Sequence, residues 1–394
     1  MSMALPTRAP MMARSGDFPL DAVLVSASLI LVCIGLVMVA SASSEIAART
    51  YGNSFYLLIK HAVYLLISFG CALAALLTPV SVWKRFDVLL LVASFALLIA
   101  VQIPGVGHKV NGSTRWISLG FFTLQGSELV KLFFAVYIAG YLVRRQEEVQ
   151  NTIVGFIKPL AVLSVIVLLL LEQPDFGAAV VIMTATMGMV FLADVPFKRF
   201  LPIITLVLIG IAVIAQWQPY RLERLTTFAN PWEHQFGSGY QLTQALIAFG
   251  RGEVFGLGLG NSIQKLFYLP EAHTDFLFSI TAEELGVVGA LTVIVALGCL
   301  VIRAFRIGQT AQTQQRLFEA YLAYGIAILL GSQSLINIGV NIGLLPTKGL
   351  TLPLVSYGGN SLIITCVMIA VLLRIDLEAR LHQAETEGGK RRGR

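Results

Sequence analysis

The stretch AVLVSASLILVCIGLVMVAS, residues 22–41, holds no charged side chain. An apolar helix of about 20 residues is long enough to cross the hydrocarbon core of a bilayer. Lipid offers no partners to backbone N–H and C=O groups, so such a segment is expected to be helical. The apolar region of a signal peptide is shorter, at about 7–15 residues. We therefore interpret residues 22–41 as a retained first membrane span.

Further apolar runs follow throughout the chain, and they predict an all-α polytopic membrane protein of about ten transmembrane helices. The predicted spans are 22–41, 57–78, 87–104, 127–143, 153–171, 176–193, 200–217, 275–302, 318–344 and 351–373. The composition agrees, because 56% of the residues are hydrophobic and only 13% are charged, against roughly 25% charged residues in soluble domains. The four cysteines lie within apolar runs and are interpreted as small core residues.

The distribution of Lys and Arg predicts the orientation. The net charge of +6 could suggest nucleic acid, but the basic residues are spread over short loops, so we expect membrane lipids and no nucleic acid as partners. Placing both termini in the cytoplasm puts more than half of the Lys and Arg residues on the inner side. The predicted organisation is a cytoplasmic tail at 1–18, a transmembrane domain at 19–374, and a basic cytoplasmic tail at 375–394.

One loop is much longer than the others. Residues 218–274 are predicted to form an outer loop between spans 7 and 8, and they contain Arg221, Arg224 and Lys265. The glycine-rich run 256–260 lacks the Lys-Ser/Thr ending of a phosphate-binding P-loop and is interpreted as a flexible turn. Long loops are often functional, so the outer face is where we expect any chemistry.

Ionisable residues close to the spans are costly in lipid and call for an explanation. Asp275 is either a helix-start carboxylate that the helix dipole favours or a general base at the membrane surface. Glu128 and Lys131 are three residues apart and either form a structural ion pair or bind substrate. Arg115 is a candidate phosphate ligand.

Two further groups of polar residues lie within predicted spans. Glu283 and Glu284 are about two turns into the eighth span, and at 100° per residue they cannot both share a helix face with Asp275. Gln333, Asn337 and Asn341 recur at every fourth residue of the ninth span. This polar stripe favours hydrogen bonding between membrane helices.

Several segments together resemble the shape, elongation, division and sporulation (SEDS) family over nearly the whole chain. They are NGSTRWI (111–117), QGSELVK (125–131), GYQLTQALIA (239–248), LPEAHTDFLF (269–278), EELG (283–286) and PTKGLTLPLVSYGG (346–359). The segments AFGRGE (248–253), GLGNSIQKLFYLPEAHTDF (258–276) and TKGLTLPL (347–354) resemble the division branch. Gly126 and Asn360 depart from the family's usual proline and serine.

The resemblance implies a peptidoglycan glycosyltransferase of the inner membrane at the division septum, which polymerises lipid II. It implies that Asp275 is the essential aspartate. It also implies work with a class B penicillin-binding protein (the septal transpeptidase FtsI) and with the regulators FtsQ, FtsL and FtsB. The residues predicted to contact substrate are Arg115, Glu128, Lys131, Arg221, Arg224, Lys265, His273, Glu283, Lys348 and Ser356.

The resulting hypothesis is an inverting glycosyl transfer in which Asp275 acts as general base. Cations must receive the charge of the departing diphosphate, and a divalent ion, Mg²⁺ or Mn²⁺, is a further candidate for this task. Two alternatives remain open. One is a lipid II flippase, for which the 333–341 stripe offers some polar depth, and the other is a non-catalytic scaffold that recruits the transpeptidase.

Overall fold

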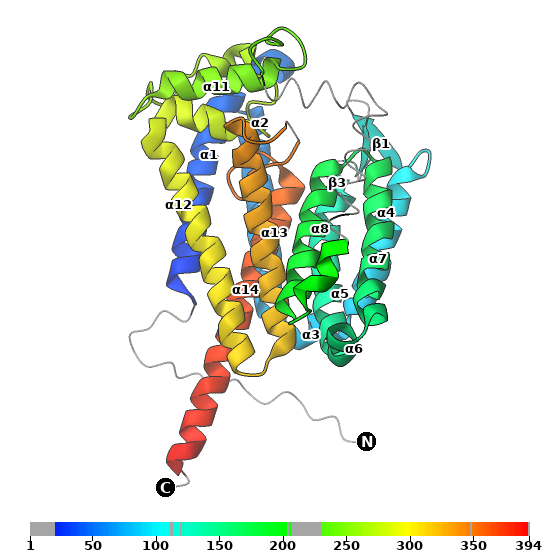
Figure 1. The fold of residues 1–394 in the computed structure, drawn as a ribbon. Coiled ribbons are helices and arrows are strands. Elements are labelled where there is room, and N and C mark those ends of the chain that lie inside the picture. Colours follow the sequence, from blue (N-terminus) through cyan, green and yellow to red (C-terminus); the bar gives the residue numbers. More distant parts are fainter. Residues whose placement is uncertain are drawn as a thin grey trace.

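The computed structural model describes residues 20–110, 113–118, 120, 122–202, 205, 230–346 and 349–392. Within these ranges, six helices are long and apolar enough to cross a membrane. They are α1 (Ala22–Tyr51), α2 (Tyr56–Leu77), α5 (Gly126–Arg144), α7 (Ile153–Glu172), α12 (Leu277–Thr313) and α13 (Leu317–Asn341). The apolar helices α4 (Asp87–Gln102) and α8 (Phe176–Leu192) are shorter. The helices form one bundle (Figure 1), which confirms a helical multi-pass membrane protein.

The outer faces of these helices carry large exposed apolar side chains. Leu66 and Phe69 of α2 are 73% and 69% exposed, and the exposed side of α12 carries Val288 and Leu291. Water would penalise so continuous an apolar surface, whereas lipid tails do not. The helices therefore turn large apolar side chains towards lipid.

The last predicted span begins later than expected. α14 runs from Gly359 to Arg392 and continues as a polar helix beyond the bundle (Figure 1), whereas the prediction began at residue 351. Residues 349–358 form an irregular segment instead. Most of the predicted span 200–217 lies outside the described residues, so the total of ten spans stays a prediction.

The helical bundle also carries a short sheet that the sequence analysis did not predict. Residues 107–125 contain a small antiparallel sheet of β1 (Gly107–Val110), β2 (Ser113–Ser118) and β3 (Thr123–Gln125), in that order. Trp116 of β2 pairs with Gln125 of β3, directly before α5 begins. Apolar runs locate spans but carry no signal for such short strands, and this sheet fixes the position of Arg115.

The two ends of the bundle differ as the charge pattern predicts. α11 (Tyr240–Gly252), β1 and β3 lie at one end, and α3 (Val80–Arg85), α6 (Gln146–Asn151) and the end of α14 lie at the other (Figure 1). The loops predicted to be cytoplasmic therefore gather at a single end. At this end the N-cap residue Asp21 accepts from Leu24 N–H at 2.8 Å. Its carboxylate also pairs with Arg303 at 2.5 Å and Arg380 at 3.3 Å.

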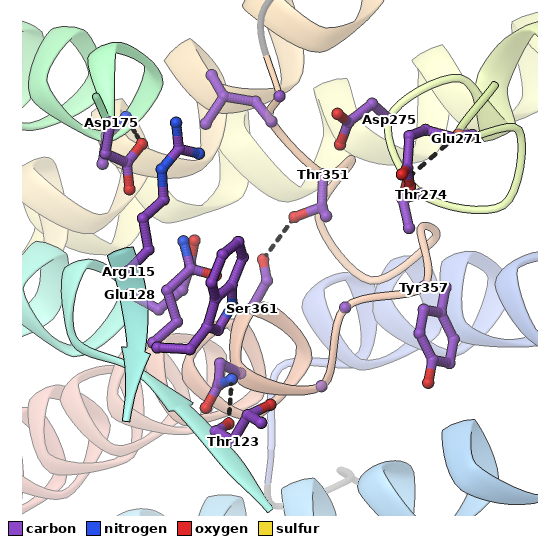
Figure 2. A pocket seen from close by; sticks show the side chains of 18 of the residues that line it. Arg115, Thr123, Glu128, Asp175, Glu271, Thr274, Asp275, Thr351, Tyr357 and Ser361 are labelled. Atoms are coloured by element: carbon purple, nitrogen blue, oxygen red, sulfur yellow. Dashed lines mark hydrogen bonds between the residues drawn. The ribbon is translucent and has the colours of Figure 1, made fainter. Parts of the chain in front are cut away.

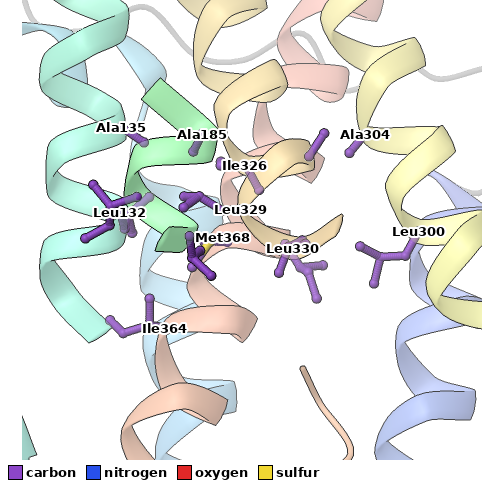
Figure 3. Packing of buried hydrophobic residues seen from close by; sticks show 14 of the residues in the cluster. Leu132, Ala135, Ala185, Leu300, Ala304, Ile326, Leu329, Leu330, Ile364 and Met368 are labelled. Carbon is purple, nitrogen blue, oxygen red and sulfur yellow. The ribbon is translucent and has the colours of Figure 1, made fainter. Parts of the chain in front are cut away.

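The bundle core is built from small and branched apolar residues. Ala135 of α5 and Ala185 of α8 approach Ile326 and Leu329 of α13, while Met368 of α14 fills the space beside them (Figure 3). These residues are buried. Small side chains allow membrane helices to pack closely, so α13 lies centrally among α5, α8, α12 and α14.

α12 is interrupted at Gly286, whose φ is +67°. Leu257 and Gly258 donate backbone N–H groups to the carbonyls of Glu283 and Glu284, both at 3.0 Å. A Cβ on Gly286 would lie 2.4 Å from the backbone nitrogen of Gly256. Only glycine therefore fits, and the outer segment 252–258 is attached to the first turns of α12, close to Asp275.

Candidate active site

A cavity of about 450 Å³ opens between the elements at the end of the bundle that carries the sheet (Figure 2). Its walls come from α2, β2, the first turns of α5 and α8, the turn 271–275 and the segment 349–361. Charged residues from separate elements converge on it. They are Lys60, Arg115, Glu128, Asp175, Glu271 and Asp275.

Asp275 lies in the turn that precedes α12, which begins at Leu277. The alternative of a carboxylate in the first helical turn is therefore wrong, and the helical-face comparison with Glu283 does not apply. The Asp275 carboxylate is half-buried, and its Oδ2 would be 3.1 Å from a Cβ on Gly349. Among the described residues, none donates a hydrogen bond to this carboxylate. Within the described part of the chain, a carboxylate without a hydrogen-bond donor thus faces the cavity.

The surroundings of Asp275 raise its pKa to about 7, mainly because burial disfavours the charged form. The carboxylates of Glu271 and Asp175 raise the pKa further, while the Arg115 guanidinium opposes them. Thr274 Oγ1 donates to Glu271 Oε2 at 2.9 Å, which keeps that carboxylate at the rim of the same turn (Figure 2). Asp275 therefore titrates close to neutral pH.

Arg115 projects from β2 to the turn between α7 and α8. Its Nε donates to the Gln173 carbonyl at 3.0 Å and its Nη2 to the Pro174 carbonyl at 2.6 Å. The neighbouring Asp175 caps α8 and accepts from Ser127 Oγ at 2.8 Å. These contacts fix the guanidinium at the cavity wall.

Glu128 and Lys131 form the predicted ion pair, at 2.7 Å. Lys131 is 1% exposed and also donates to Gln333 Oε1 at 2.7 Å. Glu128 lines the cavity, whereas Lys131 lies behind it. The pair joins α5 to α13, and substrate binding by Lys131 stays a prediction.

Lys265 and Glu283 lie in a separate polar cluster beside α1. Lys265 Nζ binds Glu284 Oε1 and Ser41 Oγ, both at 2.8 Å. Glu283 accepts from Ser262 Oγ and pairs with Arg251 at 3.2 Å. This cluster holds the outer segment onto α12, and neither predicted residue lines the cavity.

The remaining predicted contacts lie beside the cavity or outside the described residues. The His273 carbonyl accepts from Tyr357 N–H at 3.0 Å, and burial lowers the pKa of the His273 ring. Ser356 Oγ accepts from Leu352 N–H at 3.0 Å and so holds a turn. Arg221, Arg224 and Lys348 lie outside the described residues.

The sequence analysis missed most of the lining residues, among them Lys60, Tyr64, Asp175 and Tyr357. Lys60 is in the first turns of α2, within the predicted span 57–78. It has no hydrogen-bond or ion-pair partner among the described residues. The rule that ionisable residues in spans need an explanation would have singled it out.

The described parts of the chain contain no group of three or more His, Cys, Asp or Glu side chains that could hold a metal ion. The described donors therefore do not fit a dedicated divalent-cation site. Mg²⁺ in enzymes is often held by one or two carboxylates together with substrate phosphates, so the predicted Mg²⁺ or Mn²⁺ stays a proposal.

Comparison with known proteins places this site in a family. The family model for FtsW, RodA and SpoVE, described as cell cycle protein, matches residues 21–381. The chain therefore belongs to this family, the SEDS proteins, as the sequence motifs indicated.

Individual relatives refine this assignment. The chain is 53% identical to the probable peptidoglycan glycosyltransferase FtsW of Pseudomonas fluorescens (strain SBW25), covering 94% of this chain and 90% of that protein. It is also 53% identical to the protein of the same name from Hahella chejuensis (strain KCTC 2396), covering 95% of each. The high identity to FtsW proteins agrees with the division-type motifs.

Solved structures share the fold. One match is a chain from a peptidoglycan synthase complex whose structure describes how polymerization and crosslinking are coordinated. It superposes on this chain with a TM-score of 0.76 at 28% identity. That match covers 91% of this chain and 98% of the other. The rod shape determining protein RodA of Thermus thermophilus matches with a TM-score of 0.66 at 26% identity, covering 91% and 96%.

Proposed function

We propose that this protein is a peptidoglycan glycosyltransferase that polymerises lipid II into β-1,4-linked glycan strands and releases undecaprenyl pyrophosphate. The observation that carries the proposal is the Asp275 carboxylate, which faces a cavity whose lining includes the cations Lys60 and Arg115, and which has no hydrogen-bond donor among the described residues. The names of relatives at 53% identity support the same activity.

The proposed reaction is a single displacement with inversion. The acceptor's GlcNAc 4-hydroxyl attacks the anomeric carbon of the donor, and Asp275 takes the hydroxyl proton as the new bond forms. The C–O bond to the diphosphate breaks, and the diphosphate leaves with the bonding electrons. Inversion places the base on the face opposite the leaving group. A general base works best when its pKa is near the working pH, because it is then largely ionised and still binds a proton well. The pKa of Asp275, about 7, meets this condition.

Arg115 and Lys60 are the described lining cations that can receive the negative charge of the diphosphate. Fixed cations stabilise charge that develops during the reaction, because they need no reorganisation. Arg115 is already held by two carbonyls, whereas Lys60 lines the cavity without a hydrogen-bond or ion-pair partner among the described residues. A divalent ion would arrive with the diphosphate, and proton transfer to Asp275 does not depend on it.

The cellular setting is part of the proposal. We infer cytoplasmic termini, since the basic loops gather at one end of the bundle (Figure 1), and a place at the division septum from the FtsW relatives. A related chain is part of a peptidoglycan synthase complex. The proposed partners are accordingly a class B penicillin-binding protein such as FtsI and the regulators FtsQ, FtsL and FtsB.

The test compares three versions of the full chain, purified with its transpeptidase partner and given labelled lipid II. The wild type should produce glycan polymer. Asp275→Asn should bind lipid II but produce none, because the amide cannot accept the proton. Glu45→Gln, at an exposed carboxylate of α1 outside the cavity, should keep the wild-type rate. Near-normal polymer from Asp275→Asn would overturn the proposal.

Two further results would favour the alternatives. A flippase would be indicated by two results together. The wild type would scramble lipid II in liposomes without polymerising it, and Asp275→Asn would scramble it equally well. Full function of Asp275→Asn in cells would indicate a scaffold. The polar stripe of α13, which gave the flippase its sequence support, is occupied by hydrogen bonds within the protein.

A further inference from the structure

The polar stripe of α13 is directed at the backbone of the two segments that meet at Asp275. Gln333, Asn337 and Asn341 are 4%, 2% and 0% exposed. Gln333 Nε2 donates to the Thr351 carbonyl at 2.9 Å, and Asn341 Nδ2 donates to the Asp275 carbonyl at 3.0 Å. The stripe thus holds loops, besides joining helices.

Asn337 contacts both segments with one amide nitrogen. Its Nδ2 donates to the Asp275 carbonyl at 2.9 Å and to the Leu350 carbonyl at 2.5 Å. A primary amide has two hydrogens, so each carbonyl can receive one. Leu350 directly follows Gly349, the residue beside the Asp275 carboxylate. The amide therefore ties the turn of the base to the opposite wall of the cavity.

Neighbouring contacts fix the orientation of this pair of asparagines. Asn341 Oδ1 accepts from Ser279 N–H at 3.1 Å and from Ser279 Oγ at 2.6 Å. Because a backbone N–H can only donate, the oxygen of Asn341 must face Ser279 and its nitrogen must face Asp275. Asn341 therefore supports the Asp275 turn from the same side as Asn337.

We propose that Asn337 is a positioning residue, which sets the separation between the Asp275 carboxylate and the 349–351 wall by bridging their backbones. This inference rests on the proposed glycosyltransferase reaction and deepens it. A displacement of about 1 Å at a reacting group can lower the rate about 100-fold. Without the bridge, the turn and the wall can separate, and the carboxylate no longer meets the acceptor hydroxyl at the right distance.

The test uses Asn337→Ala and Asn337→Asp, purified with the partner transpeptidase. The aspartate variant keeps the size of the side chain but loses both donors. The control is Ser334→Ala on the same helix, whose hydroxyl donates to the Leu330 carbonyl of α13 at 2.7 Å and makes no other hydrogen bond to a described residue. We expect kcat to fall about 10- to 100-fold in the Asn337 variants, with KM for lipid II within about twofold and with normal rates in Ser334→Ala.

The pH profile separates positioning from simple loss of folded protein. In Asn337→Ala, which adds no charge, a loosened turn admits water to Asp275, so the acidic limb of the kcat profile should move to lower pH. Loss of folded protein would lower kcat at every pH equally and would also lower the melting temperature. Should Asn337→Asp fail to fold, Asn337→Ala and Asn341→Ala carry the same comparison. A wild-type kcat and pH profile in Asn337→Ala, or a loss that only follows the folded fraction, overturns the inference.

The two proposals fail in different ways. Normal polymerisation by Asp275→Asn contradicts the proposed function itself. An inactive Asp275→Asn together with a fully active Asn337→Ala contradicts only the positioning role.

Discussion

Raising the pH from 6 to 8 is expected to increase the polymerisation rate about tenfold, because Asp275 must be ionised to accept a proton. Its pKa is raised to about 7, against about 3.9 for an unperturbed aspartate. The active form is therefore populated above about pH 7, and activity is lost as the pH falls through this value.

The magnitude distinguishes the buried base from an ordinary one. With a pKa of 7, the ionised fraction rises from about 9% at pH 6 to about 91% at pH 8, whereas an aspartate of pKa 3.9 would change by only about 1%. The assay is the initial rate of polymer formation from saturating lipid II, measured at constant ionic strength across this range. A flat profile would refute the raised pKa of Asp275, because a base with an ordinary aspartate pKa would stay ionised across this range.

Two variants identify the titrating group. Glu271→Gln should move the midpoint to lower pH, since the negative charge of Glu271 raises the pKa of Asp275. Whatever its effect on the rate, His273→Gln should leave the midpoint of the pH profile where it is. The reason is that burial lowers the pKa of His273, so this imidazole titrates below that midpoint. A midpoint that disappears in His273→Gln would assign the profile to the imidazole instead.

Two further predictions concern the cavity wall and the interruption of α12. Lys60→Met should raise KM for lipid II or lower kcat by about 10- to 150-fold, through loss of a charge-assisted contact to diphosphate worth roughly 1.5–3 kcal/mol; unchanged kinetics would remove Lys60 from the site. Gly286→Ala should lower the unfolding free energy by about 1–3 kcal/mol, because its φ is +67° and the new Cβ would meet Gly256. Gly298→Ala lies in the same helix, and no described residue beyond the helix's own backbone comes within 4 Å of its new Cβ, so this variant should unfold no more readily than the wild type in a detergent melt.

The sequence predicted the membrane fold well, because a span must be apolar along its whole length. It also pointed to Asp275 and Arg115, whose residue types are unusual at a membrane surface. The ion pair of Glu128 with Lys131 followed from their helical spacing.

The features of the site and fold that the sequence analysis missed depend on contacts between segments that are distant in the sequence. Lys265 and Arg115 are both cations of outer loops, yet only Arg115 lines the cavity, since Lys265 pairs with Glu284. The strand that carries Arg115 has no apolar periodicity, and the Gly286 interruption depends on a segment about thirty residues earlier. Contacts between such separate segments are set by the tertiary structure and leave no local pattern in the sequence.

The ion pairs of Asp21 also have a consequence for biosynthesis. Arg303 and Arg380, which neutralise this N-cap, follow it by 282 and 359 residues. While the ribosome is still adding the later helices, the first helix therefore carries a carboxylate without its arginines at the bilayer surface. The later-made α14 completes the anchoring of α1, so these two helices, which are far apart in the sequence, reach their final packing together.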